Sequence, residues 1–263
     1  MSLPFTSGHK VFNTDLNPML LGWIDFVWIG TTLAYVSADA PTFVFSINAD
    51  VTGVLEPGMR IKLTQTTNKF FIVTAVGAYA AGVTPVTVYG GADYTLANAA
   101  ISAGAFSTHK KPFGFNTNHY KWTQASYDNS THAQASPSAN TWYNPGTLSL
   151  AIPIGAWIIA YEAQLYCVYI GVSVSKNISA RATLSTGANT ETDTELSSRL
   201  WCESANASTD SRAEASIYRQ HNVVLAAKAT YYLNVNREVN TATEIGFNGV
   251  AAPTIIRAVC AYL

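Results

Sequence analysis

Charged side chains are scarce in this sequence of 263 residues. Asp, Glu, Lys and Arg make up 12% of the chain, against about 25% in an average soluble domain. The apolar fraction is an ordinary 48%, so Thr, Ser, Asn, Gly and Ala replace the missing charges and the chain is not of the disordered class. A surface with so few charges favours coverage by other molecules, and we therefore expect a homo-oligomer.

The net charge is also small. The formal charge is −1, which provides no basic field for phosphates and argues against binding to nucleic acid or to an anionic membrane surface. The apolar segment 19–29 is interrupted by Gly22 and Asp25 and is shorter than the ~20 residues that a membrane-spanning helix needs. No signal-peptide pattern opens the sequence, so we expect neither a membrane span nor an exported precursor.

The motifs of the common enzyme classes are missing as well. The three cysteines, Cys167, Cys202 and Cys260, lie far apart in strand-like text and are interpreted as buried thiols rather than as a disulfide framework or a metal site. Neither a Gly-x-Ser-x-Gly nucleophile motif nor a phosphate-binding glycine loop occurs. The five histidines show no spacing typical of metal ligands. We therefore expect no catalytic residues and no enzyme activity.

Short alternating apolar runs, separated by turn residues, dominate the first third of the chain and predict strands. The expected strands include residues 43–47, 60–64, 70–73 and 85–89, and Glu56-Pro57-Gly58 has the residue order of a type II turn. The run 70–73 is apolar at every position, so this strand is either covered on both faces or lies at a subunit contact. With no room for crossover helices, the pattern predicts a small antiparallel β-barrel or sandwich.

A change of composition divides the chain. Residues 116–140 are polar, show no sustained period and are interpreted as a connector. Beyond them, alternating runs at 147–152, 156–169, 172–174, 178–184, 231–235 and 254–263 predict a jelly-roll-like β-sandwich. The fold is therefore expected to be all-β, with a small module at 1–115, the connector, and the sandwich at 141–263.

Two groups of residues are candidate binding sites. The run from Asn189 to Glu195 carries an oxygen-bearing side chain at every position, a composition that suits a hard cation such as calcium, although a solvated hairpin tip is the simpler interpretation. Its candidate metal ligands are Glu191, Asp193 and Glu195, and no other cofactor is expected. Aromatic rings beside the connector provide a candidate ligand or docking surface, formed by Trp122, Tyr127, Trp142 and Tyr143. Trp157 and Trp201 are assigned to the core.

Part of the first third is similar to known proteins. The similarity covers roughly residues 22–115 and is specific over the runs Ala38-Asp39-Ala40-Pro41-Thr42-Phe43, Pro57-Gly58-Met59-Arg60-Ile61-Lys62-Leu63-Thr64-Gln65-Thr66-Thr67, Lys69-Phe70-Phe71-Ile72-Val73-Thr74-Ala75-Val76 and Thr87-Val88-Tyr89-Gly90-Gly91-Ala92-Asp93-Tyr94-Thr95-Leu96. These runs resemble a module common in phage and prophage virion proteins. The resemblance implies a structural or adhesive role in the virion and no catalytic residues.

The hypothesis that follows is a bacteriophage virion structural protein that acts in attachment. It would be a tail or fibre receptor-binding component, or a capsid decoration protein, working as a homotrimer. Its partners would be other virion proteins and a host-surface glycan or protein. A carbohydrate-binding or depolymerising β protein is the alternative, and a secreted bacterial adhesion module is a third hypothesis against which the missing signal peptide counts.

Overall fold

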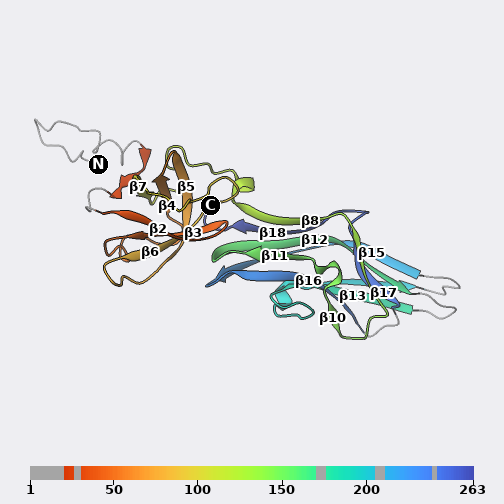
Figure 1. Cartoon of the computed structure of the whole chain (residues 1–263). Coiled ribbons are helices and arrows are strands. Elements are labelled where there is room, and N and C mark those ends of the chain that lie inside the picture. The colour runs from red at the N-terminus through yellow and green to blue at the C-terminus, as the bar shows by residue number, and fades with distance from the viewer. Residues whose placement is uncertain (1–20, 27–30, 170–175, 205–210, 239–241) are drawn as a thin grey trace, which may run out of the picture. The chain divides into compact units, whose positions relative to one another are not determined.

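A computed structural model describes residues 21–26, 31–169, 176–204, 211–238 and 242–263 (Figure 1). Valines 172 and 174, expected in a strand, lie outside the described residues. The chain divides into two compact units, the first ending at Trp122 and including Tyr262 and Leu263, the second running from Thr123 to Ala261. The expectation of an all-β protein is confirmed: the strands form three antiparallel sheets, and the described residues contain no α-helix. In particular, no helix among the described residues is long and apolar enough to cross a membrane.

The first unit is built on a single seven-stranded sheet in the order β1-β7-β4-β5-β6-β3-β2. Its strands are β1 (Ile24–Asp25), β2 (Leu33–Asp39), β3 (Thr42–Ile47), β4 (Arg60–Thr64), β5 (Asn68–Val76), β6 (Thr84–Tyr89) and β7 (Ala103–Ser107). The four strands expected in this region correspond to β3, β4, β5 and β6. The turn before β4 is also as expected, because Gly58 has a φ of +96° and the Met59 N–H donates to the Glu56 carbonyl at 3.2 Å.

The sheet of the first unit curls around its core. A Cβ placed on Gly104 of β7 would lie 2.4 Å from the Leu33 side chain of β2, although these strands are near opposite ends of the sheet order. The inner face carries a continuous apolar cluster that includes Phe45, Phe71 and Val73. A side chain at position 104 would collide with this packing, so the close approach requires glycine there.

The opposite face of β5 is covered within the same unit. The Phe70 ring lies 5.7 Å from that of Trp23 and 6.5 Å from that of Phe115, measured between ring centroids, and the neighbouring Ile72 is fully buried. Of the two interpretations of the run 70–73, coverage on both faces is therefore the one that the structure shows. This run no longer argues for a subunit contact.

Arg60 joins three distant parts of the first unit. Its side chain is 1% exposed, and its guanidinium donates to the carbonyl oxygens of Gly58, Lys110 (3.3 Å) and Tyr262 (3.0 Å). The guanidinium carbon also lies 4.7 Å from the centroid of the Phe115 ring. A buried charge is tolerated only when its donors are satisfied, so these carbonyls and the ring explain why an arginine occupies the first position of β4.

The second unit contains two sheets. One has the order β10-β16-β13-β14 with β11 also paired to β16, and the other has the order β8-β18-β12-β17-β9 with β15 paired to β12. Their strands are β8 (Thr123–Asp128), β9 (Thr131–Ala135), β10 (Trp142–Tyr143), β11 (Ser149–Ile152), β12 (Gly155–Tyr169), β13 (Lys176–Ser185), β14 (Ser198–Ser204), β15 (Ser211–Leu225), β16 (Ala229–Arg237), β17 (Glu244–Asn248) and β18 (Thr254–Cys260).

The segment 116–140 differs from its interpretation as a connector without regular structure. It contains a 3-10 turn at His119–Trp122 and the strands β8 and β9, which pair with β18 and β17. These short strands have few bulky apolar residues because each lies at one end of its sheet, and the neighbouring strand supplies the backbone partners. The boundary between the two compact units falls between Trp122 and Thr123, within the segment 116–140.

The core of the second unit is organised by β12. Its odd-numbered residues from Trp157 to Cys167 are almost fully buried, and the Tyr161 hydroxyl reaches the carbonyl of Ala182 in β13 of the other sheet at 3.1 Å. The two sheets therefore pack face to face. Cys167 and Cys260 are buried, as expected, whereas the Cys202 side chain lies outside what the structure describes. The jelly-roll topology stays a prediction.

Candidate functional site

The polar loop between β13 and β14 is anchored to the outer face of its sheet. Thr183, Ser185 and Asn234 point away from the core and are nonetheless fully buried. The Asn234 amide donates to the carbonyls of Gly187 (3.0 Å) and Thr190 (2.8 Å). The Ser185 hydroxyl lies within hydrogen-bond distance of the Thr190 and Thr192 hydroxyls. The Thr and Asn side chains of this loop thus serve mainly to fix its backbone on the sheet.

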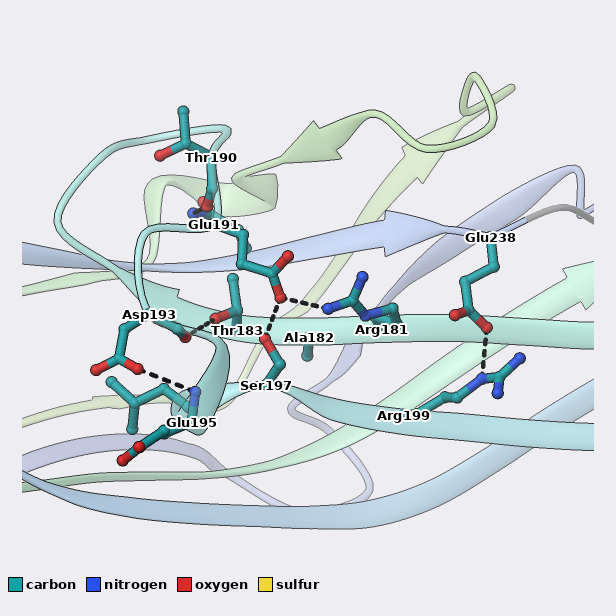
Figure 2. A network of polar contacts seen from close by, with 12 residues as sticks. Arg181, Ala182, Thr183, Thr190, Glu191, Asp193, Glu195, Ser197, Arg199 and Glu238 are labelled. Atoms are coloured by element: carbon teal, nitrogen blue, oxygen red, sulfur yellow. Dashed lines mark hydrogen bonds and ion pairs between the residues drawn. The ribbon is translucent and has the colours of Figure 1, made fainter.

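Only two of the three predicted metal ligands in this loop are brought together. Glu191 accepts hydrogen bonds from Arg181 and from the Ser197 hydroxyl (Figure 2). Asp193 and Glu195 lie at the 3-10 turn Thr194–Leu196, where the Glu195 N–H donates to the Asp193 carboxylate at 2.9 Å. The three carboxylates therefore do not converge on one point.

His221 of β15 completes a different cluster. Its Nδ1 lies 2.8 Å from the Glu195 carboxylate and its Nε2 lies 3.8 Å from that of Asp193. The three ligand atoms lie within 4.8 Å of one another, so Asp193, Glu195 and His221 are the described residues that could hold a metal ion. An imidazole suits a borderline metal such as zinc better than calcium. Nothing in the sequence spacing indicated His221, because only the packing of β15 beside the turn brings it there.

A row of arginine and tryptophan side chains crosses the outer face of the same sheet. In the strand register Trp142 lies opposite Asn236, Asn236 opposite Arg181, and Arg181 opposite Arg199. The Arg181 guanidinium lies 5.2 Å from the Trp142 ring centroid. The Arg199 guanidinium lies 4.7 Å from that of Trp201, which is two residues further along β14. We call Trp142, Arg181, Arg199 and Trp201 the Trp-Arg row.

Each arginine of the Trp-Arg row also forms an ion pair with a glutamate. Arg181 pairs with Glu191, and the Arg199 Nε donates to Glu238 at 2.6 Å (Figure 2). Like charges directly opposite each other across two strands are destabilising. The two glutamates remove this repulsion and hold the guanidinium planes in place.

The four predicted aromatic residues do not form one surface. Trp122 is 1% exposed in the first unit, stacked on Phe115 with 5.0 Å between centroids. In the second unit, Tyr127 is exposed on β8. Trp142 and Tyr143 are half-buried on β10, where the Tyr143 hydroxyl accepts the Ser138 N–H at 2.9 Å, and this hydrogen bond lowers the pKa of the phenol. Of the four, only Trp142 belongs to the Trp-Arg row.

Trp201 was missed as a surface residue. Trp157 and Trp201 are both predicted core residues, and Trp157 is fully buried. Trp201 is 51% exposed, because it lies on the opposite face of β14 from the buried Leu200. An alternating pattern identifies a strand, but it does not say which of its two faces meets the core when apolar residues occur on both.

Comparisons with known proteins give no family. No protein-family description and no curated protein matches the chain. Among solved structures, a chain of the structure of infectious bursal disease virus, Gx strain, is 10% identical with a TM-score of 0.23, covering 87% of this chain and 59% of the viral one. The cycloalternan-forming enzyme from Listeria monocytogenes, in complex with a pentasaccharide substrate, is 12% identical with a TM-score of 0.17. It covers 90% of this chain and 22% of the enzyme. Similarity at these TM-scores does not indicate a shared fold.

Proposed function

We propose that the protein is a structural component of a bacteriophage particle, with a role in attachment rather than catalysis. The observation that carries this proposal is the position of the sequence runs that resemble the phage virion module. The runs 57–67 and 69–76 contain β4 and most of β5, and the runs 38–43 and 87–96 contain the first residues of β3 and the last residues of β6. These four strands are consecutive in the sheet order and line one core. The similarity therefore concerns a folded unit rather than scattered residues.

The second unit supports a role on an exposed part of a particle. Its outer loop is fixed by neutral hydroxyl and amide contacts rather than by salt-dependent ion pairs alone. We propose that it has a jelly-roll-like fold and forms the exposed lobe, and that the first unit attaches the protein to other virion proteins. Tail, fibre and capsid surface are all consistent with this division.

The experiment that tests the proposal is mass spectrometry of purified phage particles, followed by localisation of the protein by electron microscopy. We expect peptides of this chain in particles at a stoichiometry that matches a symmetric position. Peptides found only in the infected-cell lysate, and never in particles, would contradict the virion role.

Assembly is tested separately. We propose a homotrimer, based on the low charge content of the chain and on the resemblance to virion proteins. Light scattering of the purified protein should give the mass of a trimer. A stable monomer at micromolar concentration would contradict the oligomer while leaving the virion role open to the particle analysis.

A further inference from the structure

The Trp-Arg row forms a small platform on the outer face of one sheet. It spans four neighbouring strands, β10, β16, β13 and β14, and three spacings of about 4.8 Å make it roughly 14 Å long. Trp201 lies beside the end of this line, about 7 Å further along β14. Each indole is in contact with a guanidinium, and the 51% exposure of Trp201 leaves much of its ring open to a ligand.

The platform carries no net charge. Arg181 is neutralised by Glu191 and Arg199 by Glu238. An anionic ligand would have to displace a glutamate before it gained a guanidinium, and a cationic ligand faces the reverse exchange. Phosphates, sulfates and anionic lipids are therefore poor matches, whereas a neutral ligand meets a complete set of donors and acceptors.

Its size also disfavours a protein partner. One line of side chains across four strands, with Trp201 beside its end, covers on the order of 100 Å², while a stable protein interface buries about 800 Å² on each partner. An area of this size matches a chain-like ligand of low molecular mass. Trp142, Arg181 and Arg199 follow one line across the strands, which suits a linear ligand better than a compact one.

We propose that the Trp-Arg row binds a neutral oligosaccharide. Sugar rings present C–H groups on their faces and hydroxyls around their edges. The C–H faces pack on the two indoles, and the hydroxyls donate to the glutamate oxygens and accept from the guanidinium N–H groups. This inference rests on the proposed function, because it identifies the host-surface component as a neutral glycan and assigns its recognition to the second unit.

The test uses the full-length protein and three neutral probes: maltohexaose, cellohexaose and N-acetylchitohexaose. Isothermal titration calorimetry should show binding of at least one of them. Trp201→Ala should weaken that binding by about tenfold or more. Trp142→Ala should also weaken it, because the second indole lies on the same row.

Tyr218→Ala is the matched control. Tyr218 is 47% exposed and also lies close to an arginine, with Arg257 5.9 Å from its ring centroid, but it belongs to β15 of the other sheet. Its replacement should leave the affinity unchanged within about twofold. Circular dichroism of all variants verifies that the fold is retained.

Three results would overturn the inference. None of the neutral probes binds at millimolar concentration, or an acidic probe such as a heparin hexasaccharide binds in their place, or Trp201→Ala has no larger effect than the control. If Trp201→Ala instead dissociates the oligomer in sedimentation velocity and no sugar binds, the row is a subunit contact. The particle analysis above reports on the proposed function separately, since a virion protein without sugar affinity refutes only this inference.

Discussion

Arg60 should contribute about 3 kcal/mol to the stability of the first unit. Replacement by methionine keeps an unbranched side chain, although a shorter one, and removes the donors to the carbonyls of Gly58, Lys110 and Tyr262. A buried acceptor that loses its partner costs about 1–3 kcal/mol. The three hydrogen bonds are only partly buried, and the desolvation of a buried charge is no longer needed, so the expected loss is about 3 kcal/mol.

Hydrogen exchange measured by mass spectrometry is the suitable assay, because it reports on each unit separately. A loss of about 3 kcal/mol corresponds to about 100-fold faster exchange of the most protected amides. The acceleration should occur in peptides that cover β4 and β5 and be absent from those that cover β12. Lys111→Met, an exposed change in the same unit, is the control. An acceleration of β4 and β5 below about threefold would refute the reasoning, as would equal acceleration of both units.

Four further results are expected. A fragment of residues 123–261 should be soluble and melt cooperatively, whereas the fragment 136–261, which lacks β8 and β9, should not. Burial raises the pKa of the Cys167 thiol to about 12, so iodoacetamide at neutral pH should label it only after unfolding, as mapped by peptide mass spectrometry. Burial also raises the pKa of Tyr161 to about 12, while the unfolded phenol titrates near 10. The contribution of Tyr161 to the free energy of unfolding should therefore be fully present below about pH 10 and be lost as the pH rises to about 12. Urea titrations should show a shallower loss of stability over this range for Tyr161→Phe. Calorimetry with millimolar calcium should detect no binding heat, because Arg181 already pairs with Glu191, one of the three carboxylates of the loop. Asp193→Asn should accordingly leave the melting temperature unchanged.

Strands rich in bulky apolar residues could be predicted from the sequence, and the others could not. β3 and β12 were recognised because large side chains alternate in them. β15 was not predicted although it is as long as β12, since its inward positions include small residues such as Ala213 and Ala215, and most of its outward positions are charged or polar. Such a strand is stabilised by its pairing with β12 along its whole length, and a partner so far away in sequence leaves no local pattern.

The candidate site shows the same limit. The regular spacing of oxygen-bearing side chains identified Asp193 and Glu195, which do lie together. Glu191 is directed elsewhere by Arg181, and His221 arrives from another sheet. Both depend on which strands are neighbours. Local composition therefore identified the loop but not the set of side chains that surround it.

The return of the chain to the first unit bears on the order of folding. Residues 123–261, which we call the inserted segment, form the second unit, and the chain then returns to the first unit, where Tyr262 contacts Gly58 and Arg60. Closing so long a loop from a disordered chain costs conformational entropy, but Thr123 and Val259 are register partners once β8 has paired with β18. Folding of the inserted segment thus shortens the effective loop to a few residues and lowers the entropic free energy of loop closure by about 3 kcal/mol. The inserted segment should consequently fold first, and Tyr262 should bind to the first unit only after it has folded.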